Sequence, residues 1–112
     1  MIKVELGELA ADYARLRAEL GRADWLCQGY AQDRGPGAGG PCYQWTRKER
    51  GKTVSVALSR EQYEALQAAI TEWRRVAEIL DQMQRLTRQM IFGTLPDTRR
   101  RKPLTKKTLG LN

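Results

Sequence analysis

Few residues of this chain have the side chains that catalysis or metal binding requires. The 112 residues include two cysteines, Cys27 and Cys42, and no histidine. Histidine is the commonest general base and metal ligand, and a closed zinc site needs four Cys or His ligands. The sequence therefore predicts no cofactor and no nucleophile paired with histidine. We interpret the cysteines as small, part-buried thiols; a disulfide or a shared metal site remains the alternative.

Carboxylates could act as acids or bases, but most of those in residues 59–92 are interleaved with arginines. Solvated ion pairs at helical spacing are the usual arrangement for such a surface. Gly51-Lys52-Thr53 resembles the end of a phosphate-binding Walker A loop, yet Thr46 stands where that loop needs glycine, and a strand follows instead of a helix. We predict that the protein is not an enzyme.

Basic residues give the clearest indication of function. The net charge is +7 and the sequence pI is near 9.9. Two clusters could neutralise phosphates, one at a predicted hairpin tip and one near the C-terminus. The candidate nucleic-acid-binding residues are Arg47, Lys48, Arg50, Lys52, Arg99, Arg100, Arg101, Lys102, Lys106 and Lys107. A solvated charge run is the alternative for both clusters, and at the hairpin tip the two interpretations are evenly matched.

Four aromatic residues in the first half of the chain could stack on nucleobases. They are Trp25, Tyr30, Tyr43 and Trp45. The strand pattern around Tyr43 and Trp45 favours packing against the second helix for these two.

Secondary-structure elements must position these residues. The first element that the sequence predicts is a helix over 5–21. Its apolar residues follow one another at spacings of three and four, which makes a single seam. The seam consists of Leu6, Leu9, Tyr13, Leu16 and Leu20.

The middle of the chain predicts three short strands, 25–30, 42–47 and 53–58. The Gly- and Pro-rich stretch 34–41 is predicted to be a loop. An Arg50-Gly51 turn would join the last two strands, because glycine tolerates the positive φ of a tight hairpin. The register then pairs Tyr43 with Leu58, Trp45 with Val56, and Arg47 with Val54.

A long second helix is predicted over 60–92. Ser59 and Gln62 form a capping box at its start. Its second half carries an apolar stripe that the shorter first helix could not cover fully, so we predict a protein interface there. The stripe consists of Val76, Ile79, Leu80, Met83, Leu86 and Met90. Residues 93–112 are predicted to be a flexible basic tail.

The stretch from Gly40 to Thr53, followed by the long helix, resembles an uncharacterised family of small bacterial proteins. Its specific features are Gly40-Pro41, Tyr43 and Gly51-Lys52, and the resemblance covers roughly residues 6–92. Members of that family are often encoded beside transposases or in other mobile elements. The chain departs from the family pattern at 35–40, where glycines replace a cysteine-rich knuckle. The resemblance implies a nucleic-acid-associated role and leaves zinc binding in doubt.

These observations predict an α+β protein with a single domain over 1–92 and a basic tail. We expect an accessory nucleic-acid-binding protein of a mobile element, with DNA favoured over RNA. It would dock on a larger recombinase, nuclease or ribonucleoprotein machine, and could form a homodimer. The alternative is a helical protein–protein adaptor. Without a run of about 20 apolar residues or a signal-peptide pattern, we expect a cytoplasmic protein with no membrane association.

Overall fold

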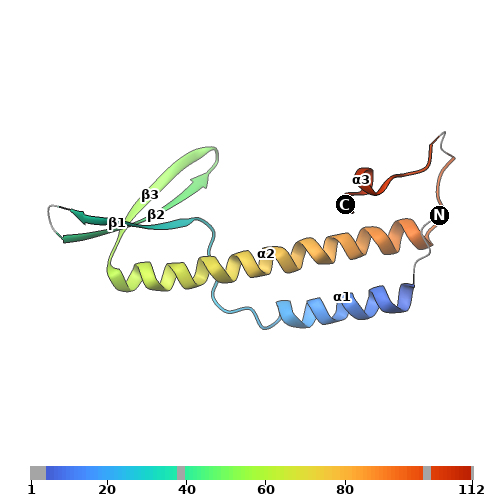
Figure 1. Cartoon of the computed structure of the whole chain (residues 1–112), viewed down its shortest axis with the longest axis horizontal. Helices are drawn as coiled ribbons and strands as arrows, with labels where there is room; N and C mark the ends of the chain where they lie inside the picture. The colour runs from blue at the N-terminus through green and yellow to red at the C-terminus, as the bar shows by residue number, and fades with distance from the viewer. Residues whose placement is uncertain (1–4, 38–39, 100–101, 112) are drawn as a thin grey trace. The chain divides into compact units, whose positions relative to one another are not determined.

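The computed structural model describes residues 5–37, 40–99 and 102–111. It contains helices and one antiparallel sheet, which confirms the predicted α+β class (Figure 1). The elements are α1 (Leu6–Leu20), β1 (Tyr30–Gly37), β2 (Gly40–Glu49), β3 (Lys52–Leu58), α2 (Arg60–Thr94) and α3 (Lys106–Leu109).

The chain divides into two compact units. One unit joins residues 1–22 to residues 77–112, and the other consists of residues 23–76. Helix α2 therefore contributes its first half to the sheet-containing unit and its second half to the unit that contains α1. The single domain expected over 1–92 stays a prediction.

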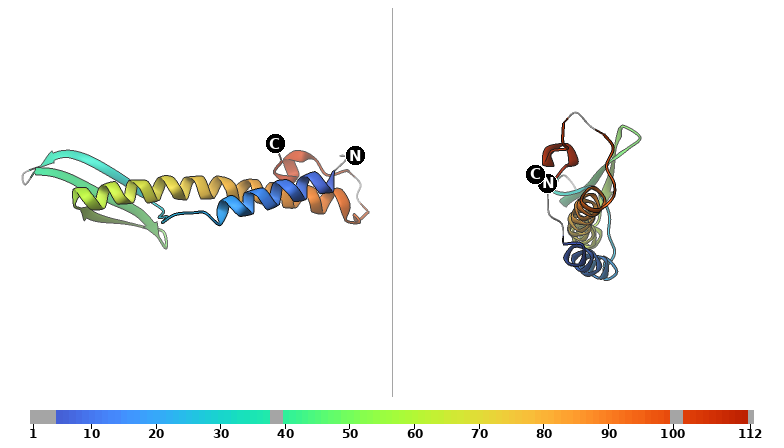
Figure 2. Two further views of the ribbon diagram at one scale, coloured as in Figure 1. Left: turned by 90° about the horizontal axis from the view of Figure 1, so that it is seen from below. Right: turned by 90° about the vertical axis from the view of Figure 1, so that its right-hand side faces the viewer.

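The unit formed by α1 and the second half of α2 is held together by an apolar core. Leu16 of α1 is buried with Ile79 and Met83 of α2, and the three form one cluster. Figures 1 and 2 show the two helices side by side in three views. The partly buried residues packed against this cluster are Tyr13, Leu20, Leu80 and Leu86. The predicted seam is thus confirmed in its second half, whereas Leu6 at its start is 50% exposed.

The C-terminal tail includes one helical turn, α3, in the same unit. The Thr105 side chain caps this turn by accepting a hydrogen bond from the Thr108 N–H at 3.1 Å. Gly110 ends it in the left-handed conformation, and the Arg88 guanidinium donates to the Gly110 carbonyl at 3.3 Å. This contact fixes the end of the tail on α2, while the flexibility of residues 93–112 stays a prediction.

The sheet has the order β1-β2-β3, and the predicted hairpin register is confirmed. Tyr43 pairs with Leu58, Trp45 with Val56, and Arg47 with Val54. Arg50 and Gly51 form the connection with φ values of 50° and 80°. Two positive φ values are those of a type I′ turn, whose twist suits antiparallel strands.

The prediction of a loop over 34–41 is wrong. Residues 34–37 belong to β1 and residues 40–41 to β2, and Pro36 pairs with Pro41. The register shifts between Asp33 and Pro36, where Gly35 adopts a φ of 79° and its N–H donates to the Asp33 carboxylate at 2.9 Å. A bulge can absorb such a glycine, and an edge strand tolerates proline, so these residues did not require a loop.

The predicted strand over 25–30 is also wrong, because only Tyr30 belongs to a strand. Gly29 has a φ of 123°, which lies outside the extended region that a strand needs. The backbone N–H groups of Asp24 and Cys27 in the segment before it donate to α2, as described below.

The start of α2 follows the predicted capping box. The Ser59 hydroxyl accepts from the Gln62 N–H at 3.1 Å, and the Gln62 side chain accepts from the Ser59 N–H at 2.9 Å. The helix continues to Thr94, two residues beyond the predicted end. It stops before Leu95-Pro96, since a residue that precedes proline disfavours the helical conformation.

Candidate nucleic-acid interface

The tip of the β2–β3 hairpin presents three exposed cations. Lys48, Arg50 and Lys52 fall within five residues of one another around the turn, and all three are exposed. Among the described residues, none of the three takes part in an ion pair. Their charges therefore remain available to an anion from solution.

Arg47, the fourth predicted residue of this cluster, is placed differently. Its guanidinium carbon lies 4.3 Å from the centre of the Trp45 ring, and its Nε lies 3.4 Å from the Glu49 carboxylate. One terminal nitrogen is buried. Arg47 thus covers the indole and offsets Glu49, so the local excess of positive charge comes from the other three residues.

The basic residues of the tail form a separate patch in the other unit. Arg99 and Lys102 are exposed, as are Lys106 and Lys107 on α3. Arg100 and Arg101 lie outside the described residues. The tip and the tail belong to different units, and each is a candidate phosphate-binding surface by itself.

The four aromatic candidates separate into two pairs. The Tyr43 ring stacks on Tyr63 of α2 with ring centres 4.6 Å apart, which confirms its predicted packing against that helix. The half-buried Trp45 donates its indole N–H to the Gln28 carbonyl at 3.0 Å. In contrast, Trp25 is 88% exposed and Tyr30 is 57% exposed.

Two hydrogen bonds to α2 fix the segment that carries Trp25. The Asp24 N–H donates to the Glu72 carboxylate at 2.8 Å, and the Cys27 N–H donates to the Ala69 carbonyl at 3.2 Å. Glu72 also accepts from the Arg75 guanidinium; this bond and the Asp24 N–H lower the pKa of the Glu72 carboxyl below 4.5. The sequence pattern missed this contact because Asp24 and Glu72 are 48 residues apart.

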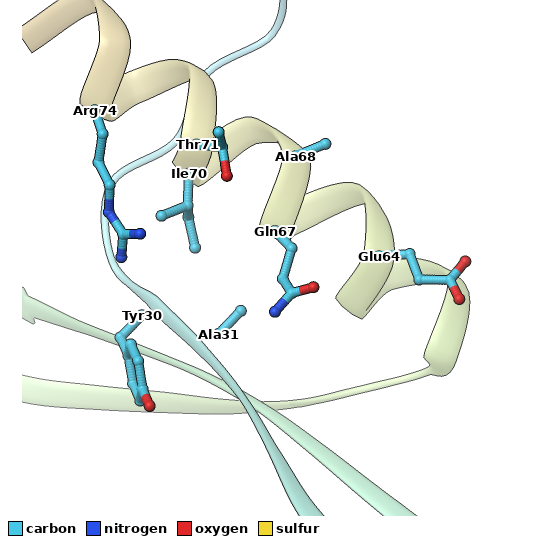
Figure 3. Close-up of a pocket in the computed structure, with 8 residues that line it drawn as sticks. All are labelled: Tyr30, Ala31, Glu64, Gln67, Ala68, Ile70, Thr71 and Arg74. Carbon is cyan, nitrogen blue, oxygen red and sulfur yellow. The ribbon is translucent and has the colours of Figure 1, made fainter.

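A groove of about 590 Å³ lies between α2 and the start of β1. Figure 3 shows Arg74, Ile70 and Gln67 reaching from the helix toward the strand, while the Tyr30 ring turns away from the helix at the rim. Ile70 is buried and forms an apolar floor. A second groove of about 360 Å³ lies beside Trp25. Ala68 and Thr71 line both grooves, so the two adjoin on α2.

The predicted protein interface on α2 is largely occupied within the chain. Val76, Ile79 and Met83 are buried, with 4%, 4% and 8% of their surface exposed. Leu80 and Leu86 pack against the Leu16 cluster, and Met90 is half-buried. We expected α1 to cover this stripe only in part. At Ile79 and Met83 the cover is complete, because both are buried in one cluster with Leu16 of α1. The exposed apolar side chains of this region lie farther along, at Ile91, Phe92 and Leu95.

The cysteines and carboxylates do not form a metal site among the described residues. Cys27 is half-buried and Cys42 is exposed. In the part of the chain that the structure describes, no group of three or more Cys, Asp or Glu residues is placed to hold a metal ion. Within the same residues, no helix is both long enough and apolar enough to cross a membrane.

Comparison with protein-family models, curated proteins and solved structures finds no match to this chain. The candidate interface therefore has to be judged on its geometry and charge.

Proposed function

We propose that the protein binds nucleic acid through phosphate contacts made by the tip of the β2–β3 hairpin. The single observation that carries this proposal is the set of three exposed, unpaired cations, Lys48, Arg50 and Lys52, on a two-residue turn. Each such cation can replace a counterion on the phosphate backbone, and counterion release supplies most of the affinity of non-specific binding.

The shape of the hairpin suits this role. A two-stranded β ribbon is narrow enough to enter the major groove of DNA, which is about 12 Å wide. The tip residues would contact phosphates and set the orientation of the ribbon, without reading the sequence. The basic residues of the tail would add further contacts of the same kind, and we propose DNA as the polymer.

We further propose an accessory role in place of catalysis. Three carboxylates of α2, Glu64, Glu72 and Asp81, pair with neighbouring arginines. Such exposed pairs are the ordinary surface of a helix. The association with a recombinase or nuclease of a mobile element rests on the sequence resemblance.

One observation favours the second candidate, a protein–protein adaptor. Three exposed apolar residues lie close together in the sequence around the end of α2, namely Ile91, Phe92 and Leu95. An apolar surface of this kind fits a protein partner better than a polyanion.

Charge removal at the tip tests the proposal. Lys48→Gln/Lys52→Gln should weaken the binding of a labelled DNA duplex equally for different sequences. It should also reduce the slope of log K against log salt by about 1 for each lysine removed. The matched control, Arg15→Gln/Arg85→Gln, removes two charges from surface pairs of α1 and α2. If the control weakens duplex binding as much as the tip variant, the hairpin is not the binding surface.

A further inference from the structure

Trp25 is the most exposed large apolar side chain described in this protein, with 88% of its surface exposed. The hydrogen bonds of Asp24 to Glu72 and of Cys27 to Ala69 hold the backbone on both sides of it against α2. Exposed aromatic side chains are typical of contact surfaces, because they offer a large area with only two side-chain torsions to order on binding.

Tyr30 extends this surface on the other side of the same stretch of α2. It borders the groove that adjoins the Trp25 groove at Ala68 and Thr71. The ring turns away from the helix at the rim (Figure 3), and Tyr30 is 57% exposed. Two exposed aromatic residues therefore border two adjoining grooves of α2, and buried Ile70 lines the groove beside Tyr30.

Arg74 gives this surface its charge. Its guanidinium reaches from α2 toward the start of β1 beside Tyr30 (Figure 3), and among the described residues it has no ion-pair partner. Three carboxylates line the two grooves. Glu64 pairs with Arg60 at 3.3 Å, Glu72 pairs with Arg75, and Asp24 accepts a hydrogen bond from the Trp25 N–H. An anion is consequently favoured at Arg74.

We propose that this surface binds a single-stranded segment of nucleic acid, with bases stacked on Trp25 and Tyr30 and a phosphate at Arg74. This inference rests on the proposed function and adds a preference for unpaired bases. Aromatic rings next to a basic group are the usual means of binding single strands, because every base offers a flat face. Bases within a duplex already stack on one another and cannot use these rings. The Asp24 carboxylate beside Trp25 places the phosphate on the Arg74 side of the surface.

The Gln67 side chain adds a group that can contact a base edge. Its amide nitrogen donates to the Tyr63 hydroxyl at 2.7 Å, which orients the amide and leaves its oxygen to accept a hydrogen bond. Gln67 points toward the strand in the same groove as Arg74 (Figure 3).

The test compares a short labelled oligodeoxythymidylate with a duplex of the same length, using the full chain and fluorescence anisotropy. Trp25→Ala and Tyr30→Ala should each weaken single-strand binding about 5- to 100-fold, the usual effect of losing one stacked base. Duplex binding should be unchanged. Tyr30→Phe keeps the ring and should bind as the parent protein does. Both residues are exposed, so thermal melting should confirm that the variants fold.

Arg74→Gln should weaken single-strand binding and reduce its salt slope by about 0.7, the value for one phosphate on a single strand. Arg85→Gln removes the same charge from the other half of α2 and should have no such effect. The proposal is overturned if Trp25→Ala and Tyr30→Ala leave single-strand affinity unchanged, or weaken single strand and duplex equally. If single-strand affinity is unchanged but duplex binding still depends on Lys48 and Lys52, only the single-strand proposal is overturned, and the function proposed for the hairpin tip is retained. A chain that binds neither polymer would overturn both.

Discussion

At the scale of single residues, a methyl group added at Gly29 would collide with two neighbours. A Cβ atom there would overlap the Trp45 Nε1 atom and lie 2.9 Å from the Thr46 carbonyl oxygen. Gly29 also has a φ of 123°, which L side chains rarely adopt. We expect Gly29→Ala to lower the free energy of unfolding by about 2–4 kcal/mol through backbone strain and overpacking.

Gly51→Ala is the matched control for this change. Gly51 also has a positive φ, of 80°, but an added Cβ meets no atom within 4 Å. It should cost only about 1–2 kcal/mol, the strain of a left-handed conformation. Urea denaturation of both variants measures the difference, and equal costs would contradict the close approach of Gly29 to Trp45.

Glu72 should make stability depend on pH. Its pKa is lowered in the folded protein, first by the hydrogen bond from Arg75 and then by the Asp24 N–H. The unfolded chain therefore binds this proton more readily. The stabilising contribution is present above the ordinary pKa of a glutamate carboxyl and is lost as the pH falls through the lowered pKa of Glu72. The Tm of Glu72→Gln should therefore fall less than that of the parent protein between pH 7 and about pH 3. A variant that keeps the parent profile would show that Glu72 does not carry this effect.

At the scale of elements, the capping box of α2 should contribute measurably to stability. Ser59→Ala removes the acceptor of the Gln62 N–H and should cost about 0.5–2 kcal/mol. The two residues cap each other through reciprocal hydrogen bonds, so a double-mutant cycle with Gln62→Ala should give a coupling energy. Strictly additive losses in thermal or urea unfolding would mean that the two hydrogen bonds act independently.

The elements that the sequence predicts well are those set by neighbouring residues. The β2–β3 register follows from the Arg50-Gly51 turn and from alternation along two adjacent strands, and the α2 cap follows from residues three apart. The hairpin tip of the candidate site was predictable for the same reason. Strand β1 was not, because its glycines fit a bulge as well as a loop. The sequence named Trp25 and Tyr30 as candidates for base stacking, but it did not predict how Trp25 is placed, since that depends on hydrogen bonds to Ala69 and Glu72, far along the chain.

At the scale of the whole molecule, the core between α1 and α2 determines how the apolar stripe behaves. Met83 is 8% exposed and lies in the Leu16 cluster. Met83→Ala should therefore lower the free energy of unfolding by about 2–5 kcal/mol, as truncation in a packed core does. Met90→Ala, at a half-buried position, should cost less.

Thermal unfolding at several protein concentrations tests the homodimer considered in the sequence analysis, whose interface included Met83. If a second copy of the chain stabilised this stripe, Tm would rise with protein concentration. We expect a Tm independent of concentration for the parent protein and for Met83→Ala, because α1 already covers Met83. A Tm that increases with concentration would show that an intermolecular interface contributes.

The measurement that tests the central claim most directly is the affinity of the intact chain for a labelled DNA duplex as a function of salt concentration. Three phosphate contacts from Lys48, Arg50 and Lys52 alone predict that log K falls linearly with log salt, with a slope of about −2.7, and contacts from the tail make it steeper. Absence of duplex binding at low salt, or binding whose affinity does not change with salt, would contradict the account.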